Sequence, residues 1–194
     1  MEVTFTKGPG RRYFMTVARE RGIALAARQG PGYHDWLPHD AVHFIVEREA
    51  ELAGGVFGRI AAGQSNIFSA ADPRRQRRSV RREARRRPSQ RERADMERSE
   101  MLASLCLPLW EYQAGHRSQM PPWVARFDPG VWRSPLLDRI LPALDEFAAR
   151  WHALPSRGGI TLTWELPASA SRLSSRSQAS RRVRPARTHA RAAR

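Results

Sequence analysis

The sequence has little cysteine and no long apolar run. Cys106 is the only cysteine among 194 residues, so no disulfide can form within the chain. It lies in the apolar run "MLASLCLPLW", which favours a small buried hydrophobe over a catalytic thiol. No run reaches the roughly 18 apolar residues of a membrane span, and "MEVTFTKGPGRRYF" at the N-terminus lacks the apolar segment of a secretory signal. We therefore expect a cytoplasmic protein without a membrane partner.

Lysine is also nearly absent, although the chain is strongly basic. Lys7 is the only lysine among 34 basic residues, and the formal net charge is +15. Residues 74–93 contribute +9 and residues 167–194 contribute +8, which leaves −2 for the remainder. The basicity is therefore confined to two segments beside a nearly neutral body. Arginine suits bidentate contacts with phosphate, but codon bias in a GC-rich genome gives the same preference without any function.

Alternating apolar and polar residues predict strands at both ends of the chain. "EVTFTK" and "RRYFMTVARE" alternate on either side of a turn at "GPG", and "IALAA" after Gly22 adds a weaker third strand. Near the other end, "GGITLTWEL" places Ile160, Leu162 and Trp164 on one side. We expect this last strand to join the N-terminal meander in one small antiparallel sheet.

Helical periodicity predicts about three helices between these strands. The first begins near Pro38 and extends to about Gly63, the second covers 94–112, and the third follows Ser134 and Pro135. The segment "GGVFG" contains Gly54, Gly55 and Gly58, which weaken the first helix. Close contact between these glycines and a neighbouring element would compensate for this loss of helix stability.

These elements predict a single α+β domain over residues 1–166, with the sheet packed against the helices. Residues 72–93 contain almost nothing to bury, and Pro88 interrupts any continuous helix, so we expect a flexible arginine-rich insertion there. Residues 167–194 are rich in Ser, Ala and Arg and have almost no large apolar residue. They are expected to form a disordered basic tail.

The stretch "LPHDAVHFIVE" contains the residues with the clearest potential for chemistry. His39 and His43 are four residues apart and so project from one side of a helix, and Glu47 continues the row. Two nitrogens and one oxygen would suit zinc or iron, with His34, Asp35 and Asp40 as outer-shell partners. The alternative is structural: both histidines lie at the border of the apolar face, and Glu47 is a solvated charge.

Two resemblances involve the same residues. His39, Asp40 and His43 resemble the His-Asp-x-x-His motif of ubiquinone-biosynthesis accessory proteins, although "GGVFG" stands where those proteins have a metal-binding glutamate. More widely, "YHDWLPHDAVHFIVEREAELAGGVFGRIAAG" and "LDEFAARWHALPSRGGITLTWEL" resemble a family of small uncharacterised bacterial proteins with a Leu-Pro-His-Asp-x-x-His-Phe-x-Val-Glu block. That resemblance implies a single domain and no particular activity.

The arginine-rich insertion predicts a second kind of site. Clustered arginines attract nucleic acid through its phosphates, without sequence preference and with strong salt dependence. No aromatic residue interrupts the run, so base stacking is not expected. We therefore expect a non-enzymatic binding protein that contacts RNA or DNA, and the alternative is a metal-dependent enzyme that uses the histidine helix. The candidate nucleic-acid contacts are Arg74, Arg75, Arg77, Arg78, Arg81, Arg82, Arg85, Arg86 and Arg87.

Overall fold

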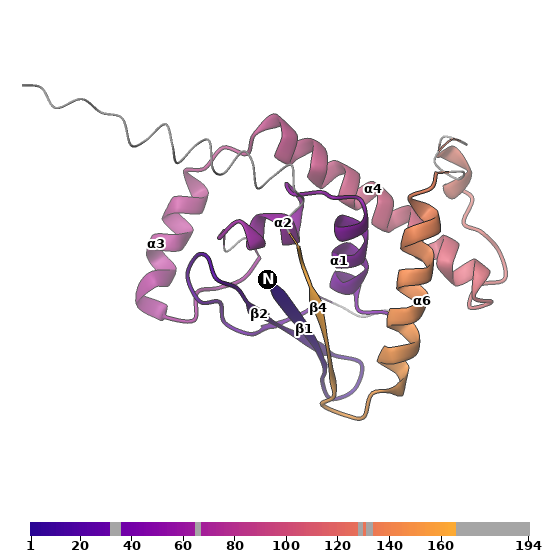
Figure 1. Ribbon diagram of the computed structural model, residues 1–194, viewed down its shortest axis with the longest axis horizontal. Coiled ribbons are helices and arrows are strands. Elements are labelled where there is room, and N and C mark those ends of the chain that lie inside the picture. Colours follow the sequence, from indigo (N-terminus) through magenta and orange to yellow (C-terminus); the bar gives the residue numbers. More distant parts are fainter. Residues whose placement is uncertain (32–35, 65–66, 128–129, 131–133, 166–194) are drawn as a thin grey trace, which may run out of the picture.

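The computed structural model describes residues 1–31, 36–64, 67–127, 130 and 134–165, and these form an α+β fold as predicted (Figure 1). Four antiparallel strands make one sheet in the order β3-β2-β1-β4. Their bounds are β1 (Glu2–Lys7), β2 (Tyr13–Ala18), β3 (Arg28–Gln29) and β4 (Gly159–Thr163). The strand predicted near the C-terminal end does join the meander, because β4 pairs with β1. The weak third strand is displaced: "IALAA" is not part of the sheet, and Leu25 makes an isolated bridge with Ala70.

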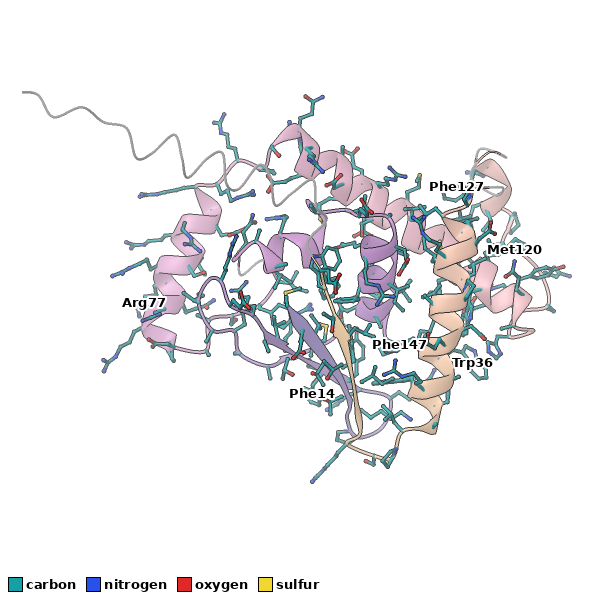
Figure 2. The ribbon with its side chains drawn as sticks, in the orientation of Figure 1. Phe14, Trp36, Arg77, Met120, Phe127 and Phe147 are labelled. Atoms are coloured by element: carbon teal, nitrogen blue, oxygen red, sulfur yellow. The ribbon has the colours of Figure 1, made fainter. Side chains whose placement is uncertain are left out.

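One face of the sheet is apolar and is covered by two helices. These are α1 (His39–Glu49) and α6 (Leu137–Ala153). Phe5 of β1 lies between them, with its ring 6.3 Å from Phe44 of α1 and 5.8 Å from Phe147 of α6, centroid to centroid. Figure 2 shows Phe147 extending from α6 towards the strands. Both contacts are edge-to-face, the geometry that aromatic rings prefer in a core.

A longer helix, α4 (Gln90–Gln113), packs against both α1 and α6 and adds a further layer (Figure 1). It continues through Pro108, where the sequence predicted a kink or an end, and α6 likewise continues through Pro142. Cys106 of α4 is buried, as predicted, and burial raises the pKa of its thiol to about 12. A short 3-10 turn, η1 (Val124–Arg126), follows α4.

The first predicted helix is divided in two. It extends only to Glu49 and is followed by α2 (Val56–Ala61), so the prediction of a continuous helix to about Gly63 was wrong. Glu51 has a φ of 54°, which is incompatible with a right-handed α-helix, and the chain changes direction at this residue. A Cβ on Gly54 would lie 2.7 Å from the Cα of Glu92 in α4, so this glycine does permit the close approach that the sequence suggested.

Most residues of the predicted flexible insertion are helical, and residues 85–89 connect its two helices. Helix α3 (Pro73–Ala84) begins with Asp72 as its N-cap, whose carboxylate accepts a hydrogen bond from the Arg74 N–H at 2.9 Å. Helix α4 begins with a capping box between Ser89 and Glu92. Pro88 separates the two helices, as expected. The helices on either side of it were not predicted, and they form because arginine favours helix and both starts are capped.

Two further expectations concern the limits of the fold. The predicted disordered tail, 167–194, lies outside the described residues. Within the described part of the chain, no helix combines the length and the apolar character needed to cross a bilayer.

Candidate functional site

Helix α1 places both predicted histidines on one side, as their spacing requires. The rings of His39 and His43 are 4.7 Å apart, centroid to centroid. His39 is exposed, whereas His43 is buried where α1 meets α4. The two rings therefore have different surroundings, and only His43 is held by the protein interior.

Glu47 is not on the wet face of α1, where the helical periodicity placed it. Its exposed fraction is 0%, and both carboxylate oxygens accept backbone hydrogen bonds at 2.8 Å, Oε1 from the Val56 N–H and Oε2 from the Phe57 N–H. These N–H groups are at the start of α2 and have no partner within that helix. Glu47, in the last turn of α1, therefore caps the start of α2. The interpretation of Glu47 as a solvated charge was wrong.

Burial of Glu47 also changes its acidity. Removal from water raises the pKa of this carboxyl to about 7, although the hydrogen bonds from Phe57, Val56 and Ser99 act in the opposite direction. The space for the carboxylate depends on Gly55, because a Cβ at that position would lie 2.4 Å from the Glu47 Cδ atom.

The predicted metal set, His39, His43 and Glu47, is not brought together. The Glu47 oxygens face the start of α2, and the described residues contain no group of three His, Cys, Asp or Glu side chains placed to hold a metal ion. Of the predicted outer-shell partners, His34 and Asp35 lie outside the described residues. Asp40 accepts a hydrogen bond from the Tyr13 hydroxyl at 2.5 Å, which ties the start of α1 to the sheet.

A buried chain of hydrogen bonds instead joins Glu47 to His43 through Ser99 of α4. The Ser99 hydroxyl donates to Glu47 Oε1 at 2.9 Å and lies 3.1 Å from His43 Nδ1. While the Glu47 carboxyl is ionised, the one hydrogen of the Ser99 hydroxyl is directed to Glu47, so Ser99 accepts from His43 and Nδ1 carries the hydrogen. Burial lowers the pKa of His43, which keeps the imidazole neutral at pH 7. The lone pair of the ring is therefore on Nε2.

The other side of His43 borders a pocket of about 300 Å³ between α1, α4 and the segment that follows α4. This volume is at the lower end of the range for small-molecule sites, about 300–1,000 Å³. Glu100 lies at its rim, with Oε2 at 3.8 Å from His43 Nε2 and its side chain 63% exposed. The lining residues are His39, Val42, His43, Glu100, Ala103, Ser104, Leu107, Pro108, Glu111, Arg117 and Trp123.

The wall of the pocket opposite α1 is held by contacts of its own. Arg117 pairs with Glu111, its Nη2 atom 2.6 Å and its Nε atom 2.7 Å from Glu111 Oε2. The neighbouring His116 stacks on Trp36, with ring centroids 3.7 Å apart and an interplanar angle of 6°. These contacts fix the turn after α4, so the pocket is formed before any ligand arrives.

The second predicted site, the arginine segment, forms an exposed helix surface. Helix α3 lies at one edge of the molecule, away from α1 and α6 (Figure 1), and Arg77 points away from the body (Figure 2). Of the nine predicted contacts, only Arg75 and Arg86 form ion pairs within the described residues, with Asp72 and Glu92 respectively. The other seven have no acidic partner there: Arg74, Arg77, Arg78, Arg81, Arg82, Arg85 and Arg87.

The opposite side of α3 attaches the helix to the body. Ser79 is buried, Glu83 pairs with Arg59 of α2 at 2.9 Å, and Gln76 accepts a hydrogen bond from the Ala70 N–H at 2.5 Å. At about 100° per residue, these three side chains share one face, whereas the arginines from Arg74 to Arg85 span an arc of about 160° on the other. The helix is therefore docked by polar side chains and presents its cations outward.

Sequence reasoning missed the residues that complete the pocket. Ser99 and Glu100 lie in the middle of a helix, 56 positions or more from His43, and belong to no local motif. The capping box of α4 was also missed, although it can be read directly from the sequence as Ser89-x-x-Glu92. Comparison of the chain with models of protein families, with curated proteins and with solved structures gave no match.

Proposed function

We propose that this protein is a non-enzymatic binding protein that contacts RNA or DNA through the outer face of α3. The observation that carries the proposal is the group of seven arginines on and just after α3 that have no acidic partner among the described residues. Arginines that already pair with carboxylates gain little from phosphate, whereas unpaired arginines release condensed counterions from nucleic acid when they bind.

The shape of the surface around α3 also supports a phosphate partner. A hollow of about 240 Å³ lies beside α3 and is lined by Arg75, Arg78, Ser79, Arg82 and Ile23. Arg78 and Arg82, which have no acidic partner among the described residues, can donate paired hydrogen bonds to phosphate oxygens at this hollow. The pKa of Arg19 is lowered by burial and then by the neighbouring Arg82, so positive charge accumulates on this side of the molecule.

The proposal implies binding without sequence preference. The contacts are to phosphates, and α3 presents no aromatic side chain for base stacking. Affinity should therefore fall steeply with salt. In a plot of log K against log salt concentration, each phosphate contact on a duplex contributes about −0.9 to the slope.

The test is replacement of Arg74, Arg77, Arg78 and Arg81 by glutamine in the full chain. At about 0.15 M salt, the loss of four phosphate contacts should weaken binding to a mixed-sequence DNA duplex by two to three orders of magnitude and lower the salt slope by about three to four. Fluorescence anisotropy over a salt series measures both quantities.

A matched control removes the same charge elsewhere, by replacing Arg12, Arg21, Arg98 and Arg126 with glutamine. All four are exposed and lie outside α3. This variant should retain most of the affinity. Equal losses in the two variants would show that net charge alone is responsible, and affinity that disappears on removal of residues 167–194 would assign the binding to the tail.

A further inference from the structure

The pocket beside His43 contains two acceptors that form no hydrogen bond with a donor among the described residues. His43 Nε2 carries a lone pair, because Nδ1 holds the hydrogen that Ser99 accepts. Glu100 Oε2 is 3.8 Å away, which is too long for a hydrogen bond, and the imidazole is neutral at pH 7. Among the described residues, no arginine or lysine forms an ion pair with the Glu100 carboxylate. Two acceptors are therefore held side by side at the pocket wall.

The arginine that lines this pocket, Arg117, is not available to these acceptors. Its guanidinium is bound to Glu111 through both Nε and Nη2. Glu111 is 5% exposed, and its carboxylate holds Arg117 through two charge-assisted contacts, so taking this cation away from a buried carboxylate is strongly unfavourable. Arg117 therefore stays with Glu111, and the net charge of the pocket is set by Glu100.

The rest of the pocket is largely apolar. Val42 of α1 and Ala103, Leu107 and Pro108 of α4 line one part, and Trp123 lies at the edge with 41% of its surface exposed. An exposed indole at the edge of a pocket with one free carboxylate provides both apolar contact and a face that attracts a cation.

From these observations we propose that the pocket binds a small organic amine, a primary ammonium group on an apolar body. The ammonium has three donors and no acceptor, so it can donate to His43 Nε2 and to Glu100 at about 2.9 Å each. A hydroxyl, with one hydrogen, can satisfy only one of the two acceptors, and a carboxylate is repelled by Glu100. The apolar body lies against Leu107, Pro108 and Trp123.

The buried chain gives His43 its role as a positioning group for this ligand. Glu47 is fixed by the start of α2, it fixes the hydroxyl of Ser99, and Ser99 fixes the tautomer of His43. The acceptor on Nε2 is thus set by residues that do not touch the ligand. The inference is independent of nucleic-acid binding, because the pocket shares no residue with α3.

The test compares three probes of similar shape: 2-phenylethylamine, 2-phenylethanol and phenylacetate. The amine should bind to the full chain about tenfold more tightly than the alcohol, since a charge-assisted hydrogen bond is replaced by a neutral one, and phenylacetate should not bind measurably. Isothermal titration calorimetry gives the affinities, and the tryptophan emission of the protein gives a second readout because Trp123 lines the site.

Glu100→Gln should abolish the preference for amine over alcohol, and the exposure of this side chain means that the fold is unaffected. Glu97→Gln is the matched control, since Glu97 is exposed on the same helix and does not line the pocket. His43→Gln should weaken amine binding about tenfold, through loss of the Nε2 acceptor. Equal binding of the amine and the alcohol, equal effects of the two glutamate variants, or no saturable binding of the amine below about 10 mM would each overturn the proposal.

Discussion

The arginine face of α3 and the pocket beside His43 place polar groups in opposite ways. On and just after α3, seven arginines are exposed and have no acidic partner in the described part of the chain, and the helix is attached by three other side chains. Beside His43, the polar atoms of Glu47 and Ser99 are inside the protein, and each has a partner. The comparison indicates that the α3 arginines are dispensable to the fold, whereas the buried chain is part of it.

The largest expected effect is on the buried chain. Glu47→Ala should lower the free energy of unfolding by about 3 to 5 kcal/mol, because the Val56 and Phe57 N–H groups lose their acceptor and a cavity remains. Urea denaturation measures the loss. Glu97→Ala, on an exposed surface, should change stability by less than about 0.5 kcal/mol and serves as the control. A loss below about 1 kcal/mol for Glu47→Ala would mean that the cap does not support α2.

The second effect is a pH dependence that follows from the raised pKa of Glu47. The folded-state pKa of Glu47 is about 7 and the ordinary pKa of a glutamate is 4.5, so the folded state binds a proton more tightly than the unfolded state. The contribution of Glu47 is therefore fully present below pH 4.5 and is lost as pH rises through 7. The loss is about 3 kcal/mol at 1.36 kcal/mol per pKa unit.

This pH effect is measured as the difference in unfolding free energy between the wild type and Glu47→Gln across pH 5 to 8. His43, whose pKa is lowered by burial, acts in the opposite direction and is present in both proteins, so the difference isolates Glu47. A difference that stays constant over this range would contradict the raised pKa.

The smallest effect should come from α3. Replacement of Arg74, Arg77, Arg78 and Arg81 by glutamine should change the free energy of unfolding by no more than about 0.5 kcal/mol, because glutamine has a similar helix propensity and no ion pair is lost. Arg59→Gln is an informative contrast: it breaks the pair with Glu83 and should destabilise by about 1 kcal/mol. A loss above about 2 kcal/mol in the fourfold variant would remove the distinction between the two regions.

The sheet was predictable because its signal is local. Alternation alone placed Val3, Phe5, Ile160 and Leu162 on one side, and all four are buried in the core. The prediction that the last strand joins the meander followed from the need of each strand for a partner along its edge, and the structure pairs it with β1. Such patterns depend only on neighbours in sequence and on the burial of one face.

The position of Glu47 was not predictable from periodicity. On the helical wheel it lies about 80° from His39, towards the polar side. Its burial depends on the reversal at Glu51, which brings the N–H groups of Val56 and Phe57 at the start of α2 back over α1. The partnership of His43 with Ser99 is likewise tertiary, since it joins residues 56 positions apart.

The helix in the arginine segment was missed for a different reason. The prediction depended on the absence of anything to bury, which is an argument about packing. A helix forms when its ends are capped and its residues favour the conformation, and Asp72, Pro73 and Ser89 meet that condition.

The contact between Gly55 and Glu47 has a consequence for related sequences. The carboxylate occupies the space that a side chain at position 55 would need, so the two positions cannot vary independently. Any homologue with a larger residue at 55 must carry a shorter one at 47 and supply another acceptor for the start of α2. Homologous sequences should therefore show paired substitutions at positions 47 and 55.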